Sequence, residues 1–185
     1  MSVLLLPVCP TDCAGALADV AFDECAPELH FGEISKIYVA TASAVDFSNV
    51  EDLAEWTGRL DDDGTDPDDI RTLIVIGELT QPERTETPIS GGRTSYSPGT
   101  YTLPFEIDET NDTNYNFMLT SQCNLKYKIW FETSDGMLYG GNEGIEVSFK
   151  LNQPIPKGRE EYVKIMGEAK WKSAKDPLRC VSPMA

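Results

Sequence analysis

Residues 126–141 read Lys-Tyr-Lys-Ile-Trp-Phe-Glu-Thr-Ser-Asp-Gly-Met-Leu-Tyr-Gly-Gly. Tyr127, Ile129 and Phe131 recur at every second position, which predicts a strand over 126–133 with these three side chains on one face and Trp130 on the other. Ser134-Asp-Gly136 predicts a tight hairpin turn. The chain then leads through Met137-Leu-Tyr139 to Gly140-Gly141, which predicts a break or a bulge. This stretch therefore indicates antiparallel β structure.

Apolar and polar residues also alternate in the segments around this hairpin. Residues 101–107 alternate strictly and predict a half-buried strand. Residues 71–77 contain four successive apolar residues, which predict a strand buried on both faces. Further strands are expected at residues 33–41, 144–150 and 163–172.

Two cap sequences predict two short helices. Ser48-Asn-Val-Glu51 has the pattern of a capping box. The helix after it is expected to carry Val50, Leu53, Thr57 and Leu60 on one face, with Trp56 beside them. Asn111-Asp-Thr-Asn114 precedes a second helix that reaches about Gln122. In this helix Tyr115, Met118 and Leu119 are expected to face inward.

These elements predict a mainly β fold, an antiparallel β-sandwich or half-barrel with about two short helices. We expect a single β-rich domain over residues 32–172, after an irregular N-terminal segment, residues 1–31. Residues 173–185 contain two prolines and predict an extended C-terminal tail. Residues 80–100 are rich in Pro, Gly, Ser and Thr and predict a long loop. Loops of this length are usually functional or become ordered against a partner.

Charge is strongly acidic and unevenly distributed. The 185 residues carry 31 acidic and 15 basic side chains, for a net charge of −16. This balance argues against specific binding to nucleic-acid phosphates or to an anionic membrane surface. Residues 1–70 hold 16 acidic and two basic side chains, whereas residues 150–185 hold four acidic and eight basic ones. Two interpretations remain open: the charge serves solubility, or the basic segment of one copy meets the acidic face of the next.

The cysteines point to a reducing compartment rather than to a metal site. The apolar start lacks the positive region of a signal peptide, and an odd number of cysteines, five, predicts reduced thiols in a cytoplasm. Cys9, Cys13, Cys25 and His30 have the composition of a zinc site. Their spacing lacks the tight Cys-x2-Cys pair that structural zinc usually requires. Buried thiols that pin the N-terminal segment are the favoured interpretation.

No motif in the sequence names an enzyme. His30 is the only histidine, so nucleophilic catalysis has one possible imidazole base. The acidic stretch 61–69 resembles a calcium loop, but its glycine stands at position 4 rather than position 6. A solvated acidic loop is the favoured interpretation. The sequence predicts a non-enzymatic protein without a cofactor.

Residues 93–172 resemble the core of phage tail-tube proteins. The resemblance rests on the order of elements: a strand at 101–107, a capped helix at 113–122, and the strands at 126–133, 144–150 and 163–172 around the Asp135-Gly136 turn. It implies a virion structural subunit that forms rings, commonly hexameric, which stack around a channel for DNA. It also implies contacts with other virion proteins and assembly in the host cytoplasm. The long loop and the two tails would then form the contacts between rings.

Combined with the charge pattern, the resemblance implies two groups of site residues. A negative channel wall would repel DNA phosphates and let the DNA pass. The acidic lumen candidates are Asp61, Asp62, Asp63, Asp66, Asp68 and Asp69. The subunit-contact candidates are Arg84, Arg93, Lys170, Lys172, Lys175 and Arg179.

Two other interpretations remain open. One is a capsid-accessory or head–tail connector protein. The other belongs to a different class, a monomeric β-sandwich binding module for carbohydrate or protein. In that case Tyr96, Tyr101 and Tyr139 would form an exposed aromatic platform. Self-assembly distinguishes the structural interpretations from the binding module.

Overall fold

The computed structural model describes residues 30, 32–60, 66–123, 126–158 and 160–184. All of these except residue 30 belong to one unit, residues 31–185. Their elements, in chain order, are β1 (Ile34–Thr41), α1 (Leu53–Thr57), β2 (Ile70–Gly77), β3 (Glu86–Ile89), β4 (Arg93–Tyr96), β5 (Gly99–Ile107), α2 (Asp112–Ser121), β6 (Lys126–Thr133), β7 (Met137–Tyr139), β8 (Ile145–Asn152), β9 (Ile165–Ser173) and β10 (Arg179–Val181). The prediction of a mainly β, antiparallel fold with two short helices is confirmed.

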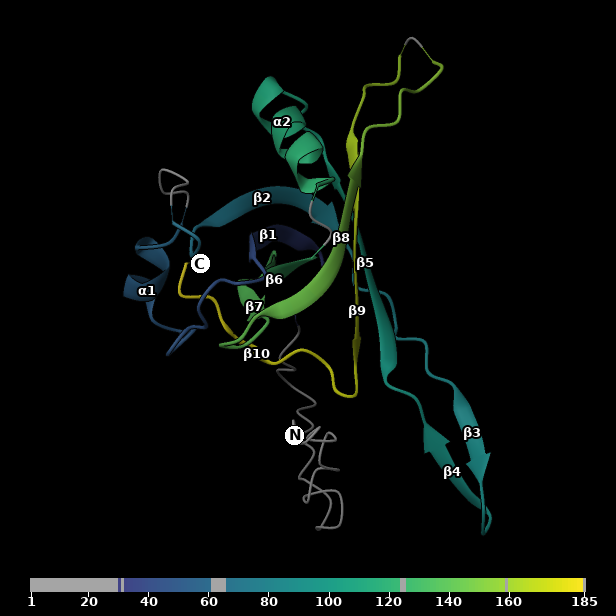
Figure 1. The fold of residues 1–185 in the computed structure, drawn as a ribbon. Coiled ribbons are helices and arrows are strands. Elements are labelled where there is room, and N and C mark those ends of the chain that lie inside the picture. The colour runs from purple at the N-terminus through teal and green to yellow at the C-terminus, as the bar shows by residue number, and fades with distance from the viewer. Residues whose placement is uncertain (1–29, 31, 61–65, 124–125, 159, 185) are drawn as a thin grey trace, which may run out of the picture. The chain divides into compact units, whose positions relative to one another are not determined.

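The strands close into a barrel rather than an open half-barrel (Figure 1). The order β1-β2-β5-β9-β8-β6 is completed by a pairing of β6 with β1, and every pairing is antiparallel. The other edge of β6 divides between two partners, because its first half pairs with β8 and its second half with β7. Strand β10 continues the sheet beyond β7. Closure joins β1 to β6 although about 90 residues separate them in the sequence.

Every second side chain of β5 points into the barrel and helps to fill it. Tyr101, Leu103, Phe105 and Ile107 are at most 4% exposed, and the residues between them face outward. Side chains of this size each contribute about 1.5–3 kcal/mol when fully buried. Gly167 of β9 pairs with Phe105, and a Cβ at this position would lie 2.1 Å from the Phe105 ring. Glycine is therefore required here for the close approach of the ring. Met118 of α2 belongs to the same core.

A second apolar core lies on the outer side of β1 and β6. Trp56 of α1 is fully buried there and packs against Phe47, Tyr38 and Trp130, with ring centroids 4.4–5.7 Å apart. The prediction that Trp130 faces away from Tyr127, Ile129 and Phe131 is confirmed, because those three belong to the barrel core.

The faces of both helices differ from the prediction. Helix α1 is shorter than expected, with Asp52 as its N-cap, and Leu53 is 51% exposed. Trp56 faces the core instead, and its indole N–H donates to the backbone oxygen of Val50 (2.8 Å). In α2 Met118 is buried as predicted, but Tyr115 and Leu119 are exposed. The prediction of those two as inward-facing was wrong, because only one narrow stripe of α2 contacts the barrel.

Strand β2 is not buried on both faces. Leu73 and Val75 point into the core, whereas Ile74 is 66% and Ile76 49% exposed. As part of a barrel wall, β2 has one inner face, and in the described residues nothing buries the outer face at these two positions. The prediction from four successive apolar residues was therefore wrong.

Two segments expected to be irregular are ordered parts of the sheet system. Residues 80–100 contain the β3–β4 hairpin, so the prediction of a long loop was wrong: this segment includes two paired strands. The predicted C-terminal tail docks on its own chain: β10 pairs with β7, and the backbone N–H of Ser182 donates to the oxygen of Gly136 (2.8 Å). Ser182 is 5% exposed. The C-terminal segment is thus fixed to the same copy.

Candidate functional site

The β3–β4 hairpin projects from the barrel and packs on neither core (Figure 1). Its strands pair in register from Glu86 with Tyr96 to Ile89 with Arg93, and all eight strand residues are exposed. Gly91 and Gly92 form the tip with φ angles of 79° and 71°, a region that favours glycine. A two-stranded hairpin is at best marginally stable alone in water. The hairpin therefore offers two unburied faces to a partner.

The root of the hairpin is held firmly to the barrel. Glu83 and Thr100 exchange two backbone hydrogen bonds of 3.1 and 2.9 Å. The hydroxyl of Tyr101 donates to Asp176 Oδ1 (2.6 Å), and Arg84 Nη2 lies 3.4 Å from the backbone oxygen of Ala174. Burial, together with the bond to Asp176, raises the pKa of Tyr101, so the hydroxyl keeps the proton that it donates. The hairpin is anchored at its base and free at its tip.

The tip combines an apolar side chain with a cation. Ile89 is 43% exposed, and Arg93 lies directly opposite it on β4. Directly paired residues of neighbouring strands lie on the same face and contact each other. At the other end of the hairpin Tyr96 is 60% exposed, and a hydrogen bond with its cross-strand partner Glu86 raises its pKa. A partner would therefore meet apolar surface and opposite charges on one element.

Sequence reasoning located this segment but missed its form. Gly91-Gly92, placed between two four-residue segments, is a hairpin signal that could have identified β3 and β4. These strands could not be recognised from their composition, because they are mostly polar and lack the alternation of apolar and polar residues that a core imposes.

The subunit-contact candidates do not form a single patch. Arg93 lies on the hairpin, Arg84 at its root, and Arg179 on β10. Lys172 of β9 pairs with Thr100 of β5, which places it near the root of the hairpin. Lys175 follows the end of β9 by two residues and therefore lies at the same end. Lys170 forms an ion pair with Glu168 (2.9 Å). Arg84, Lys172 and Lys175 thus share the hairpin end of the barrel.

Some of the acidic lumen candidates form hydrogen bonds or ion pairs with nearby residues of their own chain. Asp61, Asp62 and Asp63 lie outside the described residues. Asp66 is exposed, and its Oδ1 accepts from the backbone N–H of Asp68 (3.0 Å). Asp68 Oδ1 accepts from Val45 N (2.7 Å), and Asp69 lies 3.6 Å from Arg71. Of these three described carboxylates, only Asp66 belongs to an exposed residue.

The other predicted site residues are not assembled in the described structure. Cys9, Cys13 and Cys25 lie outside the described residues, and His30 is exposed. In the part of the chain that the structure describes, no three His, Cys, Asp or Glu side chains form a group that could hold a metal ion. The aromatic platform is contradicted: Tyr96 is exposed on the hairpin, but Tyr101 is buried against Trp171 and Tyr139 stacks on Phe131.

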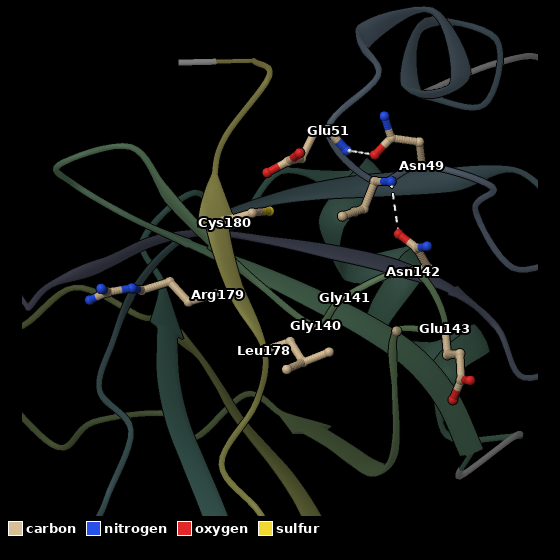
Figure 2. Close-up of a pocket in the computed structure, with 11 residues that line it drawn as sticks. Asn49, Glu51, Gly140, Gly141, Asn142, Glu143, Leu178, Arg179 and Cys180 are labelled. Atoms are coloured by element: carbon tan, nitrogen blue, oxygen red, sulfur yellow. Dashed lines mark hydrogen bonds between the residues drawn. The ribbon is translucent and has the colours of Figure 1, made fainter. Parts of the chain in front are cut away.

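A shallow groove of about 560 Å³ lies beside β10 (Figure 2). We call it the glycine-loop groove, because residues 140–144 line it together with residues 49–51 and 178–180. Trp130 packs under this loop, and a Cβ at Gly140 or Gly144 would lie within 2.6 Å of its ring.

The polar groups of the glycine-loop groove already serve the chain itself. The side chain of Asn142 accepts from Val50 N (2.9 Å) and donates to the backbone oxygen of Ser48 (3.2 Å). Burial and the nearby charge of Glu51 raise the pKa of the Cys180 thiol, which weakens it as a nucleophile. The arrangement fixes loops to one another.

No family model, curated protein or solved structure matches the chain. Among the described residues, neither helix has the length and apolar character needed to cross a membrane.

Proposed function

We propose that this chain is a self-assembling, non-enzymatic structural subunit of a virion, and specifically a phage tail-tube subunit. Its copies form rings that stack around a DNA channel with an acidic lumen. Assembly takes place in the host cytoplasm, and the mature protein resides in the virion with other virion proteins. No specific nucleic-acid contact is required, because the DNA only passes through.

One observation carries this proposal: a closed barrel displays an anchored hairpin whose strand residues are all exposed. The exposed edge of a sheet can pair with or pack on another chain, and soluble proteins usually blunt or cover such edges. An element that is fixed at its root and unburied along its length suits contact between copies. The net charge of −16 supports a surface that repels DNA rather than retaining it.

The test is the mass of the purified chain over a concentration series, measured by light scattering and combined with negative-stain electron microscopy. We expect particles of several copies, with rings or tubes that have a central hole. The matched control replaces residues 86–96 with a short Gly-Ser linker, which leaves the barrel and the Glu83–Thr100 pairing intact. This variant should be folded and monomeric. A wild-type chain that remains monomeric at every concentration contradicts the proposal.

A further inference from the structure

Strands β2 and β5 separate toward the end of the barrel that carries α2. They pair only at Ile76 with Glu106 and at Gly77 with Phe105, although β2 pairs with β1 over nearly its whole length. A cleft of about 300 Å³ opens between them. It is lined by residues 72–76 on one side and by residues 106–109 and Asn114 on the other. We call it the β2 cleft.

The β2 cleft combines exposed apolar side chains with carboxylates. Ile74 and Ile76 are 66% and 49% exposed, and they are two positions apart on the same face of β2. On the opposite wall Glu106 and Asp108 both pair with Lys164. Glu109 is exposed, and its Oε1 accepts a hydrogen bond from the side-chain amide of Asn111 (2.8 Å). The acidic side of the cleft thus retains a carboxylate that can receive a cation.

The hairpin and the β2 cleft lie at opposite ends of the same strand. The hairpin enters β5 at Gly99, and the cleft adjoins Glu106 and Ile107 at the other end. A strand of nine residues spans about 26 Å between its end residues. Figure 1 shows the hairpin directed away from the end of the barrel that carries α2. The hairpin of a copy therefore cannot reach its own cleft.

We propose that the β2 cleft of one copy receives the tip of the β3–β4 hairpin of a second copy, with Ile89 on Ile74 and Ile76 and with Arg93 beside Glu109. The two surfaces match in chemistry, because the tip places Ile89 beside the cation of Arg93, and the cleft places Ile74 and Ile76 across from the carboxylate of Glu109. The contact is heterologous, so it can repeat from copy to copy; it generates a ring where the rotation between copies closes and an open stack where it does not. This inference rests on the proposed function and names the receiving surface of its hairpin.

A complementation experiment tests the contact. The hairpin-replaced variant retains the cleft, and the double variant Ile74→Lys/Ile76→Lys retains the hairpin but should lose the cleft. Both substitutions fall on exposed side chains, so circular dichroism and the denaturation midpoint should show an unchanged fold. Each variant alone should be monomeric. Mixed in equal amounts, they should form a one-to-one dimer that does not grow, because one hairpin and one cleft remain.

A charge exchange gives an independent readout. Arg93→Glu and Glu109→Arg should each weaken self-association about tenfold, and the double variant should recover most of the loss. The control exchange is Lys126→Glu with Glu146→Lys, an exposed ion pair on β6 and β8 outside both surfaces, which should leave association unchanged.

The outcomes separate the two proposals. A wild-type chain that never associates overturns the proposed function, and this inference with it. A wild-type chain that associates, while the Ile74→Lys/Ile76→Lys variant associates equally well, overturns only the inference. Failure of the mixed variants to form a dimer, or of the double charge exchange to recover association, also overturns the inference alone.

Discussion

At the scale of single residues, Glu132 is the carboxylate on which the outer side of the sheet depends. It is 3% exposed, and it accepts hydrogen bonds from Lys36, Tyr38 and Ser182 at 2.7–2.8 Å. Burial acts to raise its pKa, but the three hydrogen bonds and the charge of Lys36 outweigh burial, so the pKa lies below its ordinary value of 4.5. Glu132 joins β1, β6 and the C-terminal segment.

The lowered pKa of Glu132 predicts a loss of stability in acid. Because its folded-state pKa lies below the unfolded one, its contribution is complete above about pH 4.5 and is lost as the pH falls through the folded-state pKa. At pH 7 Glu132→Gln should lower the free energy of unfolding by about 1–3 kcal/mol and weaken the acid dependence. Urea denaturation from pH 7 to pH 3 measures both. The control Glu146→Gln, in an exposed ion pair, should change stability by less than about 0.5 kcal/mol. Equal effects of the two variants would contradict this role of Glu132.

Gly140 is the second residue on which the outer core depends. Its φ of 136° is rarely adopted by other residues, and a Cβ would lie 2.5 Å from Trp130 Cδ1. Gly140→Ala should therefore destabilise the fold by about 2–3 kcal/mol and shift the tryptophan fluorescence, because the indole must move. Gly58→Ala, at an ordinary φ of −77° with no close neighbour, should have little effect. An unchanged midpoint for Gly140→Ala would show that the loop can move away from Trp130.

At the scale of elements, the C-terminal segment that the sequence predicted as an extended tail is docked on the barrel. Strand β10 pairs with β7, Leu178 accepts from the backbone N–H of Gly140 (3.0 Å), and Met184 and Cys180 pack on the outer core. Removing residues 178–185 should lower the free energy of unfolding by about 2–4 kcal/mol. Ser182→Ala, which removes the hydroxyl bond donated to Glu132 (2.7 Å) and the one accepted from the backbone N–H of Met184 (3.2 Å), should cost about 1–2 kcal/mol. Denaturant midpoints of both variants test this, and a truncated chain as stable as the full one would restore the interpretation of a free tail.

The elements that the sequence predicted are those whose own residues alternate against a core. Strand β5 and strand β6 carry this pattern, so their inner faces could be predicted; the bounds of β6 match the prediction, and β5 begins two residues before the predicted start at residue 101. Strands β3, β4 and β10 are short and mostly exposed, and only their pairing partners define them. The β2 cleft could not be predicted from the sequence either, because Ile74 and Ile76 belong to an apolar run typical of a buried strand. Only the closed barrel, in which β2 has one inner face, shows that these two side chains are exposed on the outer face.

At the scale of the whole molecule, exposed charges at the two ends of the barrel offer a contact between copies that differs from the one between an acidic front and a basic tail. The C-terminal segment is docked on its own copy, so it is not free to reach a neighbour. Arg84, Lys172 and Lys175 instead lie with the hairpin at one end, and Glu106, Asp108 and Glu109 lie near α2 at the other. An assembly through these ends is head-to-tail, and its electrostatic part depends on screening.

The salt dependence of association follows from this arrangement. The screening length falls from about 10 Å in 0.1 M salt to about 3 Å in 1 M salt, which removes most of the attraction between exposed charges. Self-association of the wild-type chain should weaken about five- to tenfold over this range of sodium chloride, as measured by sedimentation velocity. Arg93→Gln should associate more weakly at low salt and depend less on salt, because one of the charges that salt screens is already absent. Association that does not respond to salt in the wild-type chain would contradict the pairing of Arg93 with Glu109 and leave the apolar contact of Ile89 as the only attraction.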